Sequence, residues 1–462
     1  MYSENIYFSE IIDQKRWDVC YLSNFSLPVR KIKDNPRFRL EKLGNKYLTT
    51  IISDGEHIQL PRQRKKGIRY LYGRNIKEGI INFDPISDYS YIDEKIYKEH
   101  NRIHLQDGDV LVEIYGTIGK TALYRKQSYI GIAGIPRHIA RIHTTERLLP
   151  GYLAGILLSK FGKTQMEMSG TGNIQHLLSL KSIKELIIPI PKKIEVQREI
   201  AEIIEKTICL ETKALGKINQ ARDMFIKALW TGLTKIKKED YYKVNFSDLD
   251  YLWTPKFYYP LYQNTLKKIR RKFETIKLCE IPVDISKGDE VGSDNYKRYL
   301  EKTDTDVPFI RTSDIINYEI DNYPDFYISK DIYNELNQDL RPSDILFTKD
   351  GKIGLSAILT DFDKCILASG ISRLRIKDIL SPYYIFTVLS TKIGLYQALQ
   401  RTVTAATIPH LRLDRLVEIE IPILKEDKRD EISELIKDAF GLKNERKLLV
   451  KQAKKMVERI LE

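Results

Sequence analysis

Residues 108–119 read Gly-Asp-Val-Leu-Val-Glu-Ile-Tyr-Gly-Thr-Ile-Gly, and residues 343–354 read Ser-Asp-Ile-Leu-Phe-Thr-Lys-Asp-Gly-Lys-Ile-Gly. Each shared residue recurs 235 positions later, and the spacing between the acid and the two glycines is unchanged. In both copies a short apolar run leads into Gly-x-x-Gly, which predicts a strand followed by a tight turn or a close approach of the backbone. The chain therefore contains one structural motif twice.

The repeat extends over most of the chain. The matching segments are residues 7–10 with 245–248, Trp17 with Trp253, residues 70–76 with 309–315, residues 173–177 with 407–411, residues 188–190 with 421–423, and residues 220–221 with 452–453. Their order is kept while the offset drifts between 239 and 232, so small insertions and deletions explain the differences better than chance does. Two copies of one globular unit offer two similar surfaces that can hold two similar ligands.

The composition is that of a folded, basic protein. Of the 462 residues, 42% are hydrophobic and 30% are charged, and the net charge is +13. Clustered lysine and arginine favour a polyanion as partner, although many basic proteins bind no nucleic acid. The clusters are residues 62–74, with Arg62, Arg64, Lys65, Lys66, Arg69 and Arg74 around Tyr70 and Tyr72, and residues 267–272.

The four cysteines and the apolar runs indicate the compartment. Cys20, Cys209, Cys279 and Cys365 form no close pair, so neither a disulfide framework nor a zinc knuckle is indicated. No run approaches the roughly 18 apolar residues of a membrane span. We expect a cytoplasmic protein with no membrane partner.

The pattern of apolar residues predicts an α+β fold with two strand-rich domains. Short apolar runs punctuated by glycine and aspartate dominate each domain, with a helix expected over residues 151–161 in the first and 383–399 in the second. Prolines then precede two long helices, over about 195–233 and about 426–462. The expected division is a first domain over 1–192, a helical region over 193–240, a second domain over 241–424 and a terminal helical region over 425–462.

Both long helices carry a heptad seam in the same register. The terminal seam runs from Ile432 to Ile460 with Arg446 as its one interruption, and the equivalent seam of the first helix has polar residues at Thr207 and Lys217. Matched seams favour a mutual antiparallel coiled coil with pseudo-twofold symmetry. The alternative is that each helix packs on its own domain as an ordinary amphipathic helix.

Catalytic motifs are not recognisable in the sequence. Gly119-Lys120-Thr121 and Gly162-Lys163-Thr164 lack the preceding glycine of a phosphate-binding loop. His100 and His104 have helical metal-ligand spacing, but no third ligand is indicated. A base-amino methylation loop of the Asn-Pro-Pro-Tyr type is also missing from the sequence. These observations argue against a self-sufficient enzyme.

Together the motifs resemble the specificity subunits of type I restriction-modification systems. The first half supplies the family's segments in order, at residues 70–76, 108–111, 116–120, 172–177, 188–191 and 197–200. The second half departs from the pattern: Lys352 stands where threonine is usual, Ile408-Pro409 replaces Ile-Gln, and the glutamine before the last helix is lost in residues 428–432. The resemblance covers nearly the whole chain.

The resemblance implies a non-catalytic subunit with two target-recognition domains, each reading half of a bipartite, asymmetric site in double-stranded DNA. The two helical regions would set the length of the unread spacer and dock two methyltransferase subunits. The chain itself would need no cofactor, because those subunits bring S-adenosylmethionine, and two restriction subunits, in a complete restricting complex, bring ATP and magnesium. Base modification requires base flipping, and the chain that positions the duplex need not hold the catalytic pocket.

Side chains on loops that can neutralise phosphates or reach base edges are the candidates for DNA contact. In the first domain they are Arg62, Arg64, Lys65, Lys66, Arg69, Arg74, Lys120, Arg137 and Asn173, and in the second Arg311, Ser313, Lys349, Lys352, Arg373 and His410. Two alternatives stay open at this point. One is an autonomous restriction or modification enzyme with an unrecognised catalytic motif, and the other is a scaffold that binds nucleic acid at two sites.

Overall fold

The computed structural model describes residues 29, 32–33, 35–56, 58, 66–83, 90–116, 118–170, 177–230, 241–249, 252–290, 307–377, 380–405 and 408–461. The chain forms two compact units, unit 1 with residues 1–212 and 446–462, and unit 2 with residues 213–445. Within the described ranges, no helix has both the length and the apolar character that crossing a bilayer requires.

Unit 1 is built around an antiparallel sheet that contains the first copy of the repeated motif. Its strands follow the order β2 (Thr49–Asp54), β8 (Ile139–Thr144), β5 (Val110–Glu113) and β6 (Thr121–Leu123). The β5–β6 connection contains Gly116 with φ +90° and Gly119 with φ +89°. L-amino acids with a side chain rarely adopt this left-handed backbone, so the predicted glycine turn is confirmed.

Smaller elements surround this sheet. A second sheet has the order β4 (Tyr91–Ile92), β3 (Ile68–Tyr70) and β7 (Ala133–Gly134), and a ribbon pairs β1 (Phe38–Lys42) with β9 (Ile187–Pro191). The helices are α4 (Glu94–Glu99), α5 (Pro150–Leu158), α6 (Lys160–Ser169) and α7 (Leu180–Glu185), with 3-10 turns at Gly73–Asn75 and Asn101–Ile103. The helix expected over 151–161 is thus two helices, because the Ser159 side chain caps α6 by accepting from the Gly162 amide.

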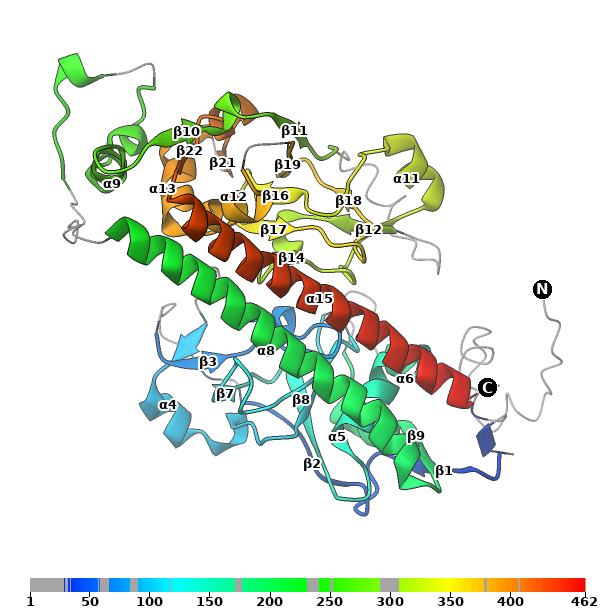
Figure 1. Ribbon diagram of the computed structural model, residues 1–462. Coiled ribbons are helices and arrows are strands. Elements are labelled where there is room, and N and C mark those ends of the chain that lie inside the picture. Colours follow the sequence, from blue (N-terminus) through cyan, green and yellow to red (C-terminus); the bar gives the residue numbers. More distant parts are fainter. Residues whose placement is uncertain are drawn as a thin grey trace. The chain divides into compact units, whose positions relative to one another are not determined.

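Unit 2 repeats this topology, which confirms the internal repeat (Figure 1). Its main sheet follows β11 (Val283–Lys287), β19 (Ile371–Ile376), β16 (Ile345–Thr348) and β17 (Ser356–Ile358), and its second sheet follows β15 (Tyr327–Ile328), β12 (Val307–Ile310) and β18 (Ile366–Leu367). Three pairs complete it: β10 (Thr275–Lys277) with β22 (Glu420–Pro422), β13 (Ile315–Ile316) with β14 (Glu319–Ile320), and β20 (Val403–Ala405) with β21 (Ile408–His410).

The helices of unit 2 also follow those of unit 1. They are α9 (Pro260–Arg270), α11 (Lys330–Leu336), α12 (Pro382–Leu389), α13 (Lys392–Gln400) and α14 (Leu413–Leu416), with 3-10 turns at Phe246–Asp248, Pro255–Tyr258, Leu278–Glu280 and Thr312–Asp314. The helix expected over 383–399 is divided into α12 and α13, as its counterpart in unit 1 is divided.

Two buried side chains per unit hold the strand that leads into each long helix. The Tyr152 hydroxyl donates to the carbonyl of Pro189, and the Tyr384 hydroxyl donates to the carbonyl of Pro422, each at 2.6 Å. The Gln165 amide both donates to and accepts from the backbone of Ile187, as Gln397 does with Glu420. These bonds satisfy backbone groups that pair with no neighbouring strand there.

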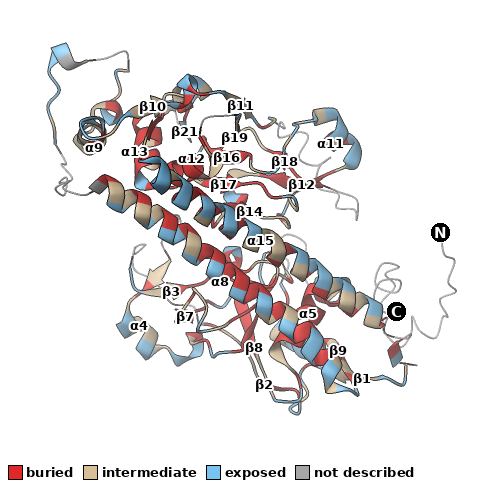
Figure 2. Ribbon diagram, viewed as in Figure 1, coloured by how far each residue is buried: buried red, intermediate tan, exposed pale blue. Residues whose placement is uncertain are grey.

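The long helices α8 (Ile194–Trp230) and α15 (Glu426–Leu461) are antiparallel partners. In unit 1, the first turns of α8 and the last turns of α15 share one hydrophobic core, to which α8 contributes Ile200 and Ile204 and α15 contributes Ala453 and Val457. In unit 2, the second half of α8 lies beside the first half of α15, where Lys217 pairs with Asp438 at 3.0 Å. Each long helix has both a buried and an exposed face (Figure 2). The coiled-coil prediction is confirmed, since both helices complete the core of unit 1.

The polar interruption of the seam has a partner. Arg446 and Glu211 are both almost fully buried in unit 1, and the Nε of Arg446 lies 3.2 Å from Oε2 of Glu211. A buried charge that is paired in only one alignment penalises every other register of the two helices.

Candidate nucleic-acid interface

Four segments that are distant in sequence meet at one edge of unit 1. The Leu71 amide donates to Gly134, the Ile114 amide to His138, and the Leu178 amide to Ile114, at 2.8 to 3.0 Å. The ring centroids of Tyr115 and His138 are 5.0 Å apart. We call residues 72–75, 114–116, 118–120, 134–138 and 177–178 the loop edge of unit 1.

The same segments meet in unit 2. The Leu411 amide donates to Lys349, the Gly351 amide to Pro409, and the Ala368 amide to Ile310, at 2.8 to 3.1 Å. We call residues 311–314, 349–354, 368–371 and 408–411 the loop edge of unit 2. The same four loops meet in both units, so the duplication has preserved this surface as well as the fold.

The backbone pairing corrects the alignment of the last segment. His410 lies opposite Asp350 in a β-bridge, and Leu177 lies opposite Tyr115 in the equivalent bridge. His410 therefore corresponds to Leu177, and its pairing with His176 from the sequence was wrong by one residue. The error arose because the sequence match aligned the His-Leu dipeptides at 176–177 and 410–411, whereas the backbone bridges place Leu177 and His410 at equivalent positions.

A buried polar side chain shapes the first turn of each loop edge. Oδ1 of Asn75 accepts from the Tyr72 amide, and Oδ2 of Asp314 accepts from the Arg311 amide, each at 2.8 Å. Burial raises the pKa of Asp314 above its ordinary value, although the Arg311 amide and guanidinium act in the opposite direction. These turns leave their central residues, Arg74 and Ser313, exposed.

Several of the residues expected to contact DNA lie on the surface. Lys66, Arg74, Arg137, Lys352 and His410 are exposed, and Lys120 is half-buried. Arg74 stacks on Tyr72, with 5.2 Å from Cζ to the ring centroid, and donates to Oγ of Ser90 at 2.6 Å. His410 pairs with the Asp350 carboxylate. Except for Lys66, these residues belong to the two loop edges.

Other expected residues are engaged inside the fold. Lys349 is buried and bonded to Asp350 at 2.7 Å. Arg373 is buried and bonded to Ser286 at 2.9 Å and Asp284 at 3.2 Å, and its counterpart in unit 1, Arg141, bonds Ser53 in the same way.

Two half-buried arginines also have partners in the protein. Arg69 donates to the carbonyl of Tyr129 at 2.7 Å. Arg311 lies 3.9 Å from the Phe326 ring centroid and close to Asp314 and Asp325. Arg62, Arg64, Lys65 and Asn173 lie outside the described residues, as does the opening segment of the first repeat.

Two kinds of residue were not predicted as functional from the sequence: exposed apolar side chains on the loop edges, and a buried acid at the opposite end of the strand that leads to each glycine turn. Tyr115 and Ile408 are exposed apolar side chains on the loop edges, at 38% and 61% exposure. Tyr115 precedes the turn glycine Gly116, which could have indicated it, whereas no such signal accompanies Ile408. The other kind is the buried acid of the repeated motif. Asp109 pairs with His143 at 2.8 Å, and Asp344 accepts from both Nε and Nη2 of Arg375 at 2.8 Å. These acids anchor the strand that leads to each glycine turn.

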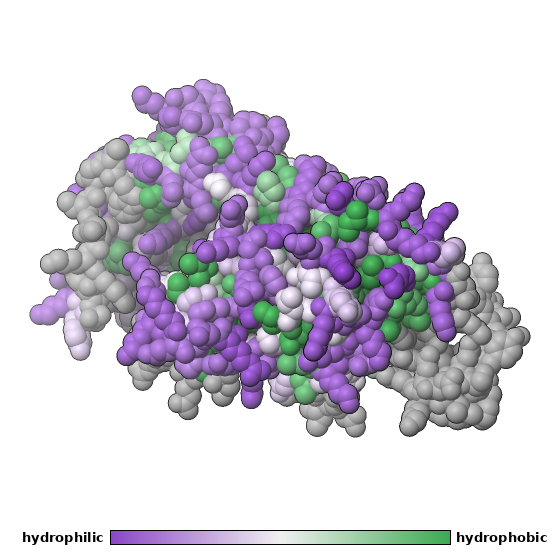
Figure 3. Space-filling view, turned by 90° about the horizontal axis from the view of Figure 1, so that it is seen from below, coloured by the Kyte–Doolittle hydropathy of each residue, from purple (hydrophilic) through white to green (hydrophobic). Residues whose placement is uncertain are grey.

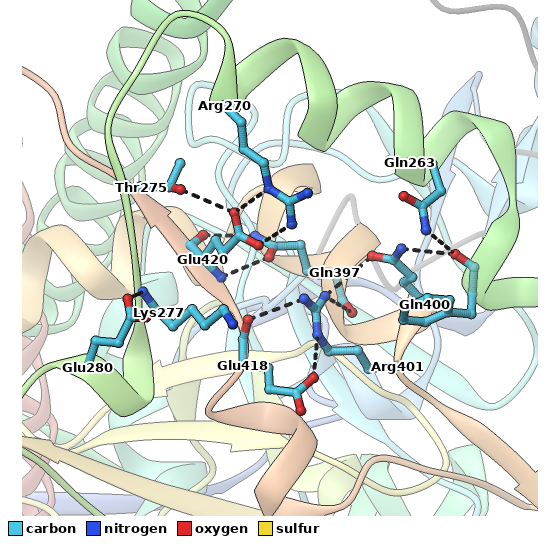
Figure 4. Close-up of polar contacts among 11 residues, drawn as sticks. Gln263, Arg270, Thr275, Lys277, Glu280, Gln397, Gln400, Arg401, Glu418 and Glu420 are labelled. Carbon is cyan, nitrogen blue, oxygen red and sulfur yellow. Dashed lines mark hydrogen bonds and ion pairs between the residues drawn. The ribbon is translucent and has the colours of Figure 1, made fainter. Parts of the chain in front are cut away.

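A polar network stabilises the fold of unit 2 where α9, β10, the end of α13 and β22 meet (Figure 4). The Glu420 carboxylate accepts from Nε of Arg270 at 2.8 Å and from the Thr275 hydroxyl at 3.2 Å. Burial alone would raise the pKa of Glu420, but the hydrogen bond and charge of Arg270 outweigh it and lower that pKa. Arg401 is buried beside it and donates to the carbonyl of Glu418 at 3.2 Å.

The residues with possible catalytic or metal-binding spacing have other roles. His100 pairs with Glu56, and the His104 ring stacks on Tyr97 at 3.9 Å between centroids. Lys120 and Thr121 belong to the β5–β6 hairpin, and residues 162–164 lie inside α6. Within the described ranges, no three histidine, cysteine, aspartate or glutamate side chains are grouped as a metal would require.

One face of the molecule is mostly hydrophilic. On the face shown in Figure 3, hydrophilic residues predominate and the hydrophobic ones form small, separate groups. A surface of this kind suits a polar or charged partner better than an apolar one.

Comparison with known proteins adds an independent line of argument. A family model described as the type I restriction modification DNA specificity domain matches residues 61–221 and 271–452, well over half of the chain. The type I restriction enzyme EcoBI specificity subunit of Escherichia coli is 27% identical over 158 residues, which are 34% of this chain and 32% of that protein. The aligned part thus spans about a third of the length of this relative.

The solved structures that match this chain include two S subunits. That of the type I restriction-modification system of M. genitalium has 14% identity and a TM-score of 0.36, covering 93% of this chain and 96% of its own. The HsdS subunit of Thermoanaerobacter tengcongensis has 15% identity and a TM-score of 0.29, covering 92% and 96%.

Proposed function

Because the chain belongs to the family of type I restriction-modification DNA specificity domains, of which it carries two copies, we propose that each unit reads one half of a bipartite DNA site. Members of this family are the non-catalytic specificity subunits of their complexes. The chemistry is therefore left to other subunits, and the task of this chain is to select the DNA.

The observation that carries the proposal is the duplicated loop edge. Each unit gathers four loops from separate elements by backbone hydrogen bonds, and a scaffold that presents several short loops at one edge can follow a groove of DNA. The two edges share their backbone but differ in side chains, for example Leu177 against His410. Such differences suit two half-sites of different sequence.

We expect two roles for the candidate side chains of the loop edges, contact with phosphates and contact with bases. The exposed Arg74, Arg137 and Lys352 and the half-buried Lys120 would neutralise phosphates, which supplies affinity without sequence information. Ser313 and His410 can exchange hydrogen bonds with base edges, and the exposed Tyr115 and Ile408 can pack against thymine methyl groups. We propose the same roles for Lys66 and for Arg62, Arg64, Lys65 and Asn173. Lys349 would act by holding Asp350 of its loop, and Arg373 by holding β11 against β19.

The same proposal extends to the rest of the complex. Target-recognition domains would cover residues 1–192 and 241–424, and the helical regions 193–240 and 425–462 would set the spacer and dock two methyltransferase subunits. S-adenosylmethionine would belong to those subunits, and ATP and magnesium to two restriction subunits where these are present. A chain that acts on chromosomal DNA in this way would work in the cytoplasm.

Methylation mapping tests the proposal directly. Genomic DNA from cells with this chain and its methyltransferase would be sequenced by a single-molecule method that reports modified bases, and compared with DNA from cells that lack only this chain. We expect a bipartite modified motif that disappears with the chain. An active methyltransferase with the same modification pattern in both strains would refute the proposal.

A further inference from the structure

A turn in unit 1 connects the loop edge with helix α15. Residues 72–75 belong to the loop edge, and residues 77–80 form the next turn, closed by the bond from the Lys77 amide to the Ile80 carbonyl at 3.0 Å. Gly79, with φ +82°, lies against Leu158 of α5 and Val450 of α15. Any shift of this turn on α15 therefore moves the adjacent loop edge.

A charged triad fixes that turn. Oε1 of Glu78 accepts from Nζ of Lys163 in α6, and Oε2 of Glu78 accepts from Nζ of Lys454 in α15 at 3.4 Å. All three side chains are at least three-quarters buried. Burial alone would raise the pKa of Glu78, but the two ammonium groups outweigh it and hold that pKa below its ordinary value. Glu78 is therefore a carboxylate at neutral pH.

Unit 2 contains a similar ion pair in the corresponding hairpin, although its acid lies at the position of Ile80 and not of Glu78. Glu319 follows the turn at Asn317 and Tyr318, whose φ angles of +50° and +68° define a tight hairpin between β13 and β14. Its carboxylate lies 3.4 Å from Nζ of Lys443 in α15, and both side chains are buried. An ion pair between an acid of this hairpin and a lysine of α15 is thus a feature of both halves, although neither the two acids nor the two lysines are related by the sequence repeat.

We propose that Glu78 and Glu319 are positioning residues that fix the orientation of each recognition domain on α15 and so restrict the complex to one spacer length. The inference rests on the proposed function. An ion pair between a turn and a helix is directional, because its hydrogen bonds weaken steeply when the angle changes. A domain that tilts on α15 would carry its loop edge along the DNA, and half-sites one base pair too close or too far would then be accepted.

The experiment uses the full chain in complex with its methyltransferase subunits. Duplexes carry the mapped half-sites separated by the natural spacer or by one base pair more or less, and the methylation rates are compared. For Glu78→Gln we expect the preference for the natural spacer to fall by about tenfold, the size of effect that follows from losing one charge-assisted bond. Lys454→Met should act in the same direction. Glu146→Gln, an exposed acid of the same unit, is the matched control and should retain the preference.

The outcomes separate the two proposals. A wild-type complex that methylates no bipartite site refutes the proposed function itself. A wild-type complex with a clear spacer preference that both variants retain, even at lower overall rates, overturns the positioning role. If Glu78→Gln does not fold, Lys454→Met decides, because it leaves the Glu78–Lys163 bond in place.

Discussion

The cations expected to contact DNA differ in whether a carboxylate of the protein already neutralises them. Arg137 is exposed and has no bonded partner among the described residues, whereas Arg373 is held by Asp284. Only a cation that is free to replace the counterions of DNA contributes to the salt dependence of binding. The same residue type therefore has two roles, according to what its neighbours in the fold supply.

For Arg137→Ala we expect weaker binding to all DNA sequences and a salt slope reduced by about one. Binding of the methyltransferase complex to a duplex would be titrated over a range of salt concentrations. Arg39→Ala, in the β1–β9 ribbon, removes an arginine that is 72% exposed and should leave the slope unchanged. Equal slopes for wild type and Arg137→Ala would show that this arginine does not contact phosphate.

The Glu420 carboxylate predicts a pH dependence of stability. Because Arg270 holds its folded-state pKa below the ordinary value of 4.5, the pair stabilises the fold above that pH. The contribution is lost as the pH falls through the lower folded-state pKa. For Glu420→Gln we expect a loss of about 1–3 kcal/mol at pH 7, measured by urea unfolding, and a smaller difference from wild type at pH 3. Glu335→Gln, an exposed acid of α11, should show no such convergence.

At the scale of elements, glycine lowers the stability of a helix at some positions and permits close packing of two helices at another. Gly216 in α8 and Gly441 in α15 are exposed and have no neighbouring atom within 4 Å of the position of a Cβ. Gly151 in α5 lies so close to α8 that a Cβ would be 2.8 Å from Cα of Ala201. The first two glycines only cost helix stability, and the third permits two helices to pack closely.

We therefore expect Gly216→Ala and Gly441→Ala each to stabilise the protein by about 0.5–1 kcal/mol. Gly151→Ala should destabilise it by about 1–3 kcal/mol, because the contact is with backbone that cannot rotate away. Thermal unfolding monitored by circular dichroism at 222 nm would report all three. A stabilising Gly151→Ala would contradict the packing of α5 on α8.

The elements could be predicted from the sequence to the extent that their signals are local. The heptad seams predicted both long helices, and the Gly-x-x-Gly motif predicted the turns. In the turn of unit 2, Gly351 and Gly354 have positive φ, as the equivalent glycines of unit 1 do. The division of α5 from α6 was missed, since a serine cap competes with an unbroken apolar run. The burial of Arg373 could not be foreseen, because Asp284 is 89 residues away and becomes its neighbour only through the pairing of β11 with β19.

At the scale of the whole molecule, unit 1 is completed by the end of the chain. Residues 446–461 of α15 supply Ala453, Val457 and Leu461 to the core that the first 212 residues begin. Unit 1 therefore cannot reach its full stability until the last helix has been made and has found its antiparallel partner. This dependence also means that a change near the C-terminus acts on the first recognition domain.

Val457→Asp tests that dependence. Val457 is 1% exposed and lies beside Gly155 and Ile200 in the core of unit 1, so an aspartate there would bury an unpaired charge at a cost of about 3–5 kcal/mol. Leu448→Asp, on the same helix at 52% exposure, is the matched control and should change stability by less than about 0.5 kcal/mol. Limited proteolysis with identified fragments should show that Val457→Asp makes residues before 212 labile while unit 2 persists. If the two variants were cleaved alike, the last turns of α15 would not belong to the core of unit 1.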